Sequence, residues 1–79
     1  MKKQISGYAA FDKQSGKAIT IYWGFRARYA LTDDPLKVEL SATEQDAERN
    51  AIWFNREHKN PKEFEIKKVV RIITIEEEN

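Results

Sequence analysis

The sequence predicts one small α+β domain over residues 1–79, in which an antiparallel sheet of three to four strands packs on one α-helix. Three patterns predict it: two strand-like segments joined by a turn, an amphipathic segment in mid-chain, and a β-rich segment near the end. Hydrophobic residues make up 41% of the chain and the net charge is only +1, which is typical of a folded domain. We expect the order β-β-(β)-α-β.

The N-terminal segment predicts a β-hairpin. Alternating apolar residues place a first strand at about 4–11 and a second at about 17–26. Between them, Asp12 can accept hydrogen bonds from the backbone that follows, and Gly16 can adopt the positive φ of a short turn. The residues expected to face the core are Ile5, Ala9, Phe11, Ile19, Ile21, Trp23 and Phe25.

Residues 28–40 allow two interpretations. The segment 32–35 predicts a turn, because Pro35 prevents a helix from passing through it. Leu36, Val38 and Leu40 then alternate with charged residues. This pattern fits either a short edge strand or an extended connector over 36–40.

The single helix is predicted to follow. Ser41 and Glu44 fit a capping box, and Thr43 is the rival N-cap. Acids in the first turn favour the helix dipole, and Pro61 ends the helix after Lys59 and Asn60. The face expected to meet the sheet contains Ala47, Ala51, Phe54 and His58, flanked by Ile52 and Trp53.

The last strand is predicted over about 64–76, which is long for a strand. Its apolar residues change parity, so either a bulge near Lys67 and Lys68 restores one apolar face or both faces are partly buried. If this strand lies at the sheet edge, its free backbone groups can pair with a partner strand or with another copy in a homodimer. The acidic residues 76–78 that follow are interpreted as a solvated tail.

Catalytic and metal chemistry find no support in the sequence. Without cysteine there is no thiol nucleophile and no Cys-type zinc site, and a reducing cytoplasm is the expected location. His58 is the only histidine and is expected to complement the helix dipole. We expect no enzyme activity, no cofactor, no metal, no signal peptide and no membrane span. The serines (Ser6, Ser15, Ser41), the acids Glu44 and Glu48, and the dispersed glycines (Gly7, Gly16, Gly24) match no catalytic, metal or phosphate motif.

The charges are distributed unevenly along the chain. Residues 1–31 carry six Lys/Arg against one acid, and residues 32–58 carry three Lys/Arg against seven acids. Regions of opposite charge favour attraction within the fold or between copies.

A protein-binding surface is the leading functional prediction. Aromatic residues form 11% of the chain, and one helix cannot cover them all. Exposed Trp, Tyr and Arg are the residue types that anchor protein interfaces. The predicted interface residues are Tyr22, Arg26, Arg28, Tyr29 and Trp53, with the alternative that Trp53 belongs to the rim of the core.

The alternative function is binding of single-stranded nucleic acid. Tyrosines and arginines on an outward sheet face would form a stacking platform for bases. The residues predicted for this platform are Tyr8, Tyr22, Arg26 and Arg28. The pI of about 8.0 is below the value of roughly 9 typical of dedicated binders, so protein binding is preferred.

Three segments carry a resemblance to a group of known proteins. The charged hairpin DKQSGK, the helix start SATEQDAE and the closing strand EIKKVVRIITIEE together resemble small accessory proteins encoded by phages and other mobile elements. The resemblance implies a compact cytoplasmic binder that acts as an inhibitor or adaptor on a host protein. It extends over architecture only, so it assigns no site residue.

Overall fold

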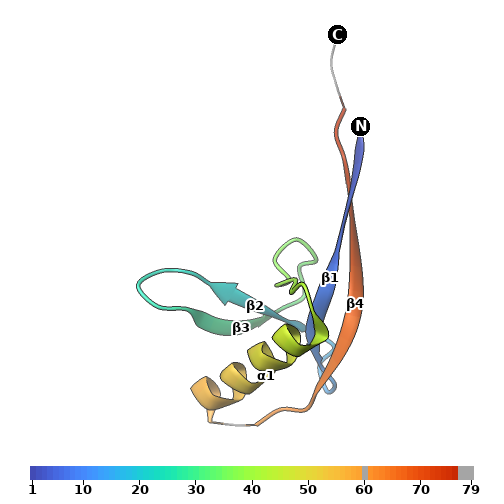
Figure 1. Cartoon of the computed structure of the whole chain (residues 1–79). Helices are drawn as coiled ribbons and strands as arrows, with labels where there is room; N and C mark the ends of the chain where they lie inside the picture. Colours follow the sequence, from blue (N-terminus) through green and yellow to red (C-terminus); the bar gives the residue numbers. More distant parts are fainter. Residues whose placement is uncertain (60, 77–79) are drawn as a thin grey trace.

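The computed structural model describes residues 1–59 and 61–76; Asn60 and the acidic tail beyond Glu76 lie outside the described residues. One helix packs on a four-stranded antiparallel sheet of order β3-β2-β1-β4, which confirms the predicted α+β class (Figure 1). The elements are β1 (Lys2–Asp12), β2 (Ala18–Tyr22), β3 (Arg28–Thr32), α1 (Glu44–His58) and β4 (Phe64–Thr74).

The predicted turn between the first two strands is confirmed. Asp12 is buried, and its carboxylate accepts the amides of Gln14 and Ser15 at 3.3 Å and the Ser15 hydroxyl at 2.6 Å. Gly16 has a φ of 75° and donates its amide to the Asp12 carbonyl. The turn is therefore organised around one buried carboxylate.

The sheet separates into two ribbons beyond this turn. β1 and β4 pair over their full lengths, and β2 pairs with β3, whereas β1 and β2 share only the pair Phe11–Ala18. In Figure 1 the β1/β4 ribbon, here called the β1/β4 arm, and the β2/β3 ribbon point in different directions from this common base.

The connector before the helix fills the gap between the two ribbons. The amide of Glu39 donates to the Ile19 carbonyl, and Tyr8 and Ser41 exchange two backbone hydrogen bonds of 2.8 Å. The alternative of an edge strand over 36–40 is wrong. Leu36 and Lys37 belong to a turn in which the Lys37 amide donates to the Asp34 carbonyl, so the predicted extended segment is also wrong for these two residues, and residues 38–40 form the connector.

Gly7 is required where the connector crosses β1. A Cβ atom at this position would lie 2.9 Å from the Ser41 carbonyl oxygen and 3.0 Å from the Cβ of Leu40. Only glycine allows this close approach without displacing the connector.

The core lies between the base of the sheet and the helix. Ala10, Ile19 and Phe54 are buried there, surrounded by the partly buried Ile21, Tyr29, Leu31, Ala51, Phe64 and Ile66. The expectation that Ala9 and Phe11 share the core face with Ile19 is wrong, because the register Phe11–Ala18 places Ala10 beside Ile19. Ala9 is buried on the opposite face instead, where Arg71 donates to the carbonyls of Pro35 and Val38 in the connector.

The helix begins two residues later than the capping box at Ser41 predicted, at the rival N-cap. Thr43 is the N-cap, and its hydroxyl accepts the Asp46 amide at 3.1 Å. Ser41 is part of the bridge to Tyr8 and accepts a hydrogen bond from Asn50, so it cannot serve as the cap. The helix ends at His58, and its C-cap Lys59 adopts a left-handed φ of 54°.

Two strand predictions need correction. β2 ends at Tyr22, and Trp23 and Phe25 are exposed in the following loop instead of facing the core. The register of β1 with β4 runs unbroken from Lys2–Thr74 to Asp12–Phe64, so the bulge near Lys67 is absent from β4 and its apolar residues occupy both faces. Ile5 lies on the exposed arm and takes no part in the core.

Candidate protein interface

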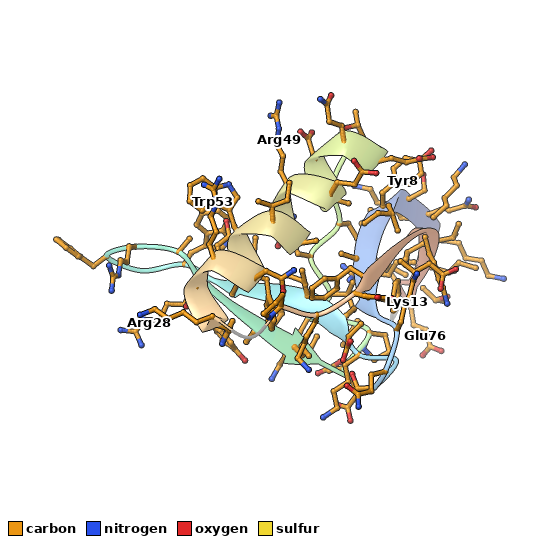
Figure 2. All side chains as sticks on the ribbon, turned by 90° about the horizontal axis from the view of Figure 1, so that it is seen from below. Tyr8, Lys13, Arg28, Arg49, Trp53 and Glu76 are labelled. Atoms are coloured by element: carbon orange, nitrogen blue, oxygen red, sulfur yellow. The ribbon has the colours of Figure 1, made fainter. Side chains whose placement is uncertain are left out.

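Four of the five predicted interface residues line one open groove between β3 and α1. This groove, here called the Trp53 groove, has a volume of about 560 Å³. Figure 2 shows Trp53 and Arg28 at the same end of the molecule, close to the β2/β3 ribbon. The groove is lined by Arg26, Ala27, Arg28, Tyr29, Trp53, Arg56 and Glu57.

The helix holds β3 in place along one side of the groove. The Tyr29 amide donates to Glu57 Oε2 at 3.0 Å, and the Tyr29 carbonyl lies 2.6 Å from His58 Nε2. The His58 ring packs on Phe54 with centroids 4.2 Å apart. His58, which the sequence predicted on the sheet-facing side of the helix and as a partner of the helix dipole, therefore ties the end of the helix to the edge of the sheet.

Trp53 stands on the exposed side of the helix. Its side chain is 51% exposed, and the Arg56 guanidinium lies 5.0 Å from its ring centroid. It also lines a neighbouring groove with Trp23 and Tyr29, so one ring separates two concave surfaces. The prediction that Tyr22, Tyr29 and Trp53 stay partly exposed is confirmed.

The loop between β2 and β3 adds two aromatic residues that the sequence analysis placed in the core. Trp23 is 73% exposed and Phe25 is fully exposed. Together with Tyr22, Gly24, Arg26 and Arg28, they line a smaller groove of about 270 Å³ at the tip of the ribbon. Gly24 was the feature of the sequence that could have indicated this loop, because a glycine inside a long apolar alternation often marks the end of regular strand pairing.

Tyr8 lies apart from the other residues predicted for nucleic-acid binding. It follows the parity of Ala10 on the helix side of β1, whereas Tyr22 follows Ala18 and Thr20 on the opposite face of β2. Figure 2 also shows Tyr8 at the other end of the molecule from Arg28. The predicted four-residue platform is therefore not one continuous surface, and only Tyr22, Arg26 and Arg28 lie together.

The charge of the Trp53 groove is mainly positive. Three arginines line it (Arg26, Arg28 and Arg56), and Glu57 is the acid beside them. The Glu57 carboxylate already accepts the Tyr29 amide. This arrangement favours an acidic group as the ligand of the arginines.

Residues 1–59 and 61–76 contain no cluster of three His, Asp or Glu side chains placed to hold a metal ion. Asp12, which lines a groove of about 390 Å³ with Lys13 and Lys62, has a structural role. The hydrogen bond from Ser15 holds the pKa of Asp12 below its ordinary value of 3.8, helped by the Gln14 and Ser15 amides and by Lys62, and opposed by burial.

Within the described part of the chain, the helix is neither long enough nor apolar enough to cross a bilayer. Comparisons with protein-family models, with curated proteins and with solved structures found no match.

Proposed function

We propose that this chain is a non-enzymatic protein-binding module that binds its partner through the Trp53 groove and the adjoining ribbon tip. The observation that carries the proposal is the gathering of four exposed aromatic side chains and three arginines at one end of the molecule. Isolated apolar residues are ordinary on a surface, but an aromatic cluster of this kind is typical of an interaction site. The aromatic residues are Tyr22, Trp23, Phe25 and Trp53.

The partner that fits this surface is a protein with an apolar patch flanked by acidic side chains. Trp53 and Phe25 supply apolar area, and Arg26, Arg28 and Arg56 supply planar donors for carboxylates. The likeness to phage accessory proteins extends the proposal to a host protein as the target and to inhibitor or adaptor as the role.

The test compares matched variants in capture from bacterial lysate with the tagged, full-length protein. Trp53→Ala and Phe25→Ala each remove one proposed anchor, and Ile52→Ala is the control because Ile52 adjoins Trp53 on the helix and is 53% exposed. Removing a central aromatic anchor costs about 2 kcal/mol or more of binding free energy. We expect one protein to be retained by the wild type and by Ile52→Ala, and lost with both anchor variants.

Two further measurements make the result decisive. Thermal unfolding must show that the variants remain folded. If Trp53→Ala unfolds, Trp53 belongs to the rim of the core, and the test of the proposed surface then rests on Phe25→Ala, because Phe25 is fully exposed. The lysate is divided into nuclease-treated and untreated halves. A protein retained equally by all variants contradicts the proposed surface.

A second candidate function rests on the ribbon tip alone. Tyr22, Trp23 and Phe25 surround the same small groove as Arg26 and Arg28, a combination suited to stacking and phosphate contact with single-stranded nucleic acid. Binding of a labelled oligonucleotide should then weaken steeply as salt rises, because phosphate contacts release counterions. Binding that is lost on nuclease treatment supports this function, and binding that is insensitive to salt and nuclease supports the protein partner.

A further inference from the structure

The two edges of the sheet differ in how their backbone groups are satisfied. At the β3 edge, the amide and carbonyl of Tyr29 are occupied by Glu57 and His58 of the helix. At the β4 edge, no hydrogen bond from the described residues reaches the outward backbone groups of Phe64–Thr74. Among the described residues, the β3 edge is tied to the helix at Tyr29, whereas the β4 edge is open along its length.

The pairing with β1 determines which groups of β4 face outward. Met1 bonds with Ile75 and Lys13 bonds with Glu63, so the odd-numbered residues of β4 direct their backbone groups toward β1. Because these groups alternate along an antiparallel strand, the even-numbered residues direct theirs to the free edge. Along the distal part of β4 these are Lys68, Val70, Ile72 and Thr74.

Over residues 69–74 the open edge has little of the usual protection against pairing. Natural edge strands are protected by bulges, prolines or charged side chains, especially lysine. The lysines of β4, Lys67 and Lys68, precede this stretch, and its one charged residue, Arg71, donates to the connector carbonyls of Pro35 and Val38. β4 has a continuous register and contains no proline, and its outward residues Val70 and Ile72 are 49% and 67% exposed. In Figure 1 the distal arm extends away from the helix, so nothing in the described chain covers these residues.

We propose that the open edge of β4 pairs antiparallel with β4 of a second copy, with Ile72 opposite Ile72 at the two-fold axis. In this register Val70 lies opposite Thr74, and Lys68 lies opposite Glu76 in both symmetry-related halves. On the other face, Val69 lies opposite Ile75, which forms an apolar cross-strand pair. The two sheets become one continuous sheet through the dimer.

Charge complementarity favours this register over those centred on Val70 and Arg71. A dimer centred on Val70 would place Lys68 opposite Ile72, and a dimer centred on Arg71 would place Arg71 opposite its own copy. Opposite charges across a ladder stabilise the pairing, and like charges destabilise it. The self-pairing is also independent of the Trp53 groove, because β4 contributes no residue to that groove.

The first test measures the solution mass of the full-length protein by sedimentation equilibrium over a series of concentrations. The mass of the wild type should rise from one chain to two. Ile72→Lys places two ammonium groups at the two-fold axis and should remain a single chain. The control Ile52→Lys replaces an equally apolar, exposed residue on the helix and should dimerise like the wild type.

The second test is a charge exchange that identifies the register. Lys68→Glu and Glu76→Lys each place like charges opposite one another and should weaken dimerisation roughly tenfold. The double variant restores opposite charges and should recover the wild-type dissociation constant. Circular dichroism confirms that each variant is folded.

Three outcomes overturn the proposal. A single-chain mass at every concentration excludes the dimer, and a dimer that survives Ile72→Lys lies elsewhere on the molecule. A double charge variant that dimerises no better than the single variants excludes this register. Trp53→Ala should dimerise normally, so failure of this proposal and failure of the proposed partner-binding function are distinguishable.

Discussion

The β2/β3 ribbon and the β1/β4 arm start from the same base and have different surfaces. The β2/β3 ribbon lies against the helix, its edge is satisfied at Tyr29, and its exposed apolar residues are concentrated in the loop at its tip. The β1/β4 arm is longer, with eleven-residue strands, and its exposed apolar residues lie in the distal part of β4, from Val70 onward. The position of the single helix accounts for the difference, because it covers one ribbon and only the base of the other.

The connector is what allows two ribbons in place of one continuous sheet. Where β1 and β2 separate, the backbone groups of Tyr8 and Ile19 would lose their partners, and residues 39–41 supply them. Unpaired buried backbone groups are costly, so this segment stabilises the separation. The two ribbons can then present different surfaces to different partners.

The largest effect is expected where the connector crosses Gly7. Gly7→Ala places a methyl group 2.9 Å from the Ser41 carbonyl oxygen, and the forced shift should lower the free energy of unfolding by about 1–3 kcal/mol. Urea unfolding measures this change in the free energy of unfolding. Gly24→Ala is the control, since a Cβ atom there meets nothing within 4 Å, and it should change stability by less than about 0.5 kcal/mol. Equal stability of the two variants would contradict the close crossing.

The next effect concerns Asp12 at the turn from which both ribbons start. Folding lowers the pKa of this carboxyl, so the charged form stabilises the fold above pH 3.8, and the stabilisation is lost as pH falls through the lower value of the folded state. The stability difference between wild type and Asp12→Asn should therefore shrink as the solution is acidified below pH 3.8. Unfolding curves at several pH values measure it.

Two variants identify the cause of the lowered pKa of Asp12. The Ser15 hydroxyl donates to Asp12 Oδ2 at 2.6 Å, whereas Lys62 Nζ lies 3.7 Å from the same oxygen. Because the Ser15 bond is the larger cause, Ser15→Ala should raise the pKa of Asp12 more than Lys62→Met does. An NMR titration of the Asp12 carboxyl carbon measures both shifts. The reverse order would make the ion pair the main cause.

The sequence predicted local structure well wherever a few neighbouring residues determine it. Asp12 and Gly16 together specify their turn, and Thr43 was recognised as a possible cap of the helix. The fold class followed from these elements and from the β-rich last segment.

Predictions that depended on residues far apart in the chain were less successful. Ser41 has the chemistry of an N-cap, but its bridge to Tyr8 takes it out of that position. Trp23 and Phe25 continue the alternation of β2, yet β3 supplies no partner strand beyond Arg28, so they end in a loop. Four candidate interface residues do lie around one groove. The face of the sheet on which Tyr8 lies could not be predicted, because it depends on the register of β1 with β2.

The smallest effect on stability is expected at the β3 edge, where the Tyr29 amide donates to Glu57. Measuring it allows a direct comparison with the β4 edge. Glu57→Ala removes the acceptor of the Tyr29 amide, while Glu57→Gln keeps an oxygen in place and serves as the control. Because the hydrogen bond is exposed, its loss should lower the free energy of unfolding by only about 0.5 kcal/mol. Hydrogen exchange at the Tyr29 amide is the sharper measurement, and it should become faster in Glu57→Ala and stay slow in Glu57→Gln.

The open edge should respond in the opposite way to the same measurement. In dilute solution the outward amides of Val70 and Ile72 should exchange quickly, since no acceptor among the described residues reaches them. At concentrations where two copies pair, both amides should become protected, and Ile72→Lys should keep the Val70 amide fast at all concentrations. If the Tyr29 and Val70 amides are equally protected in dilute solution, the two edges do not differ and the contrast between the ribbons is wrong.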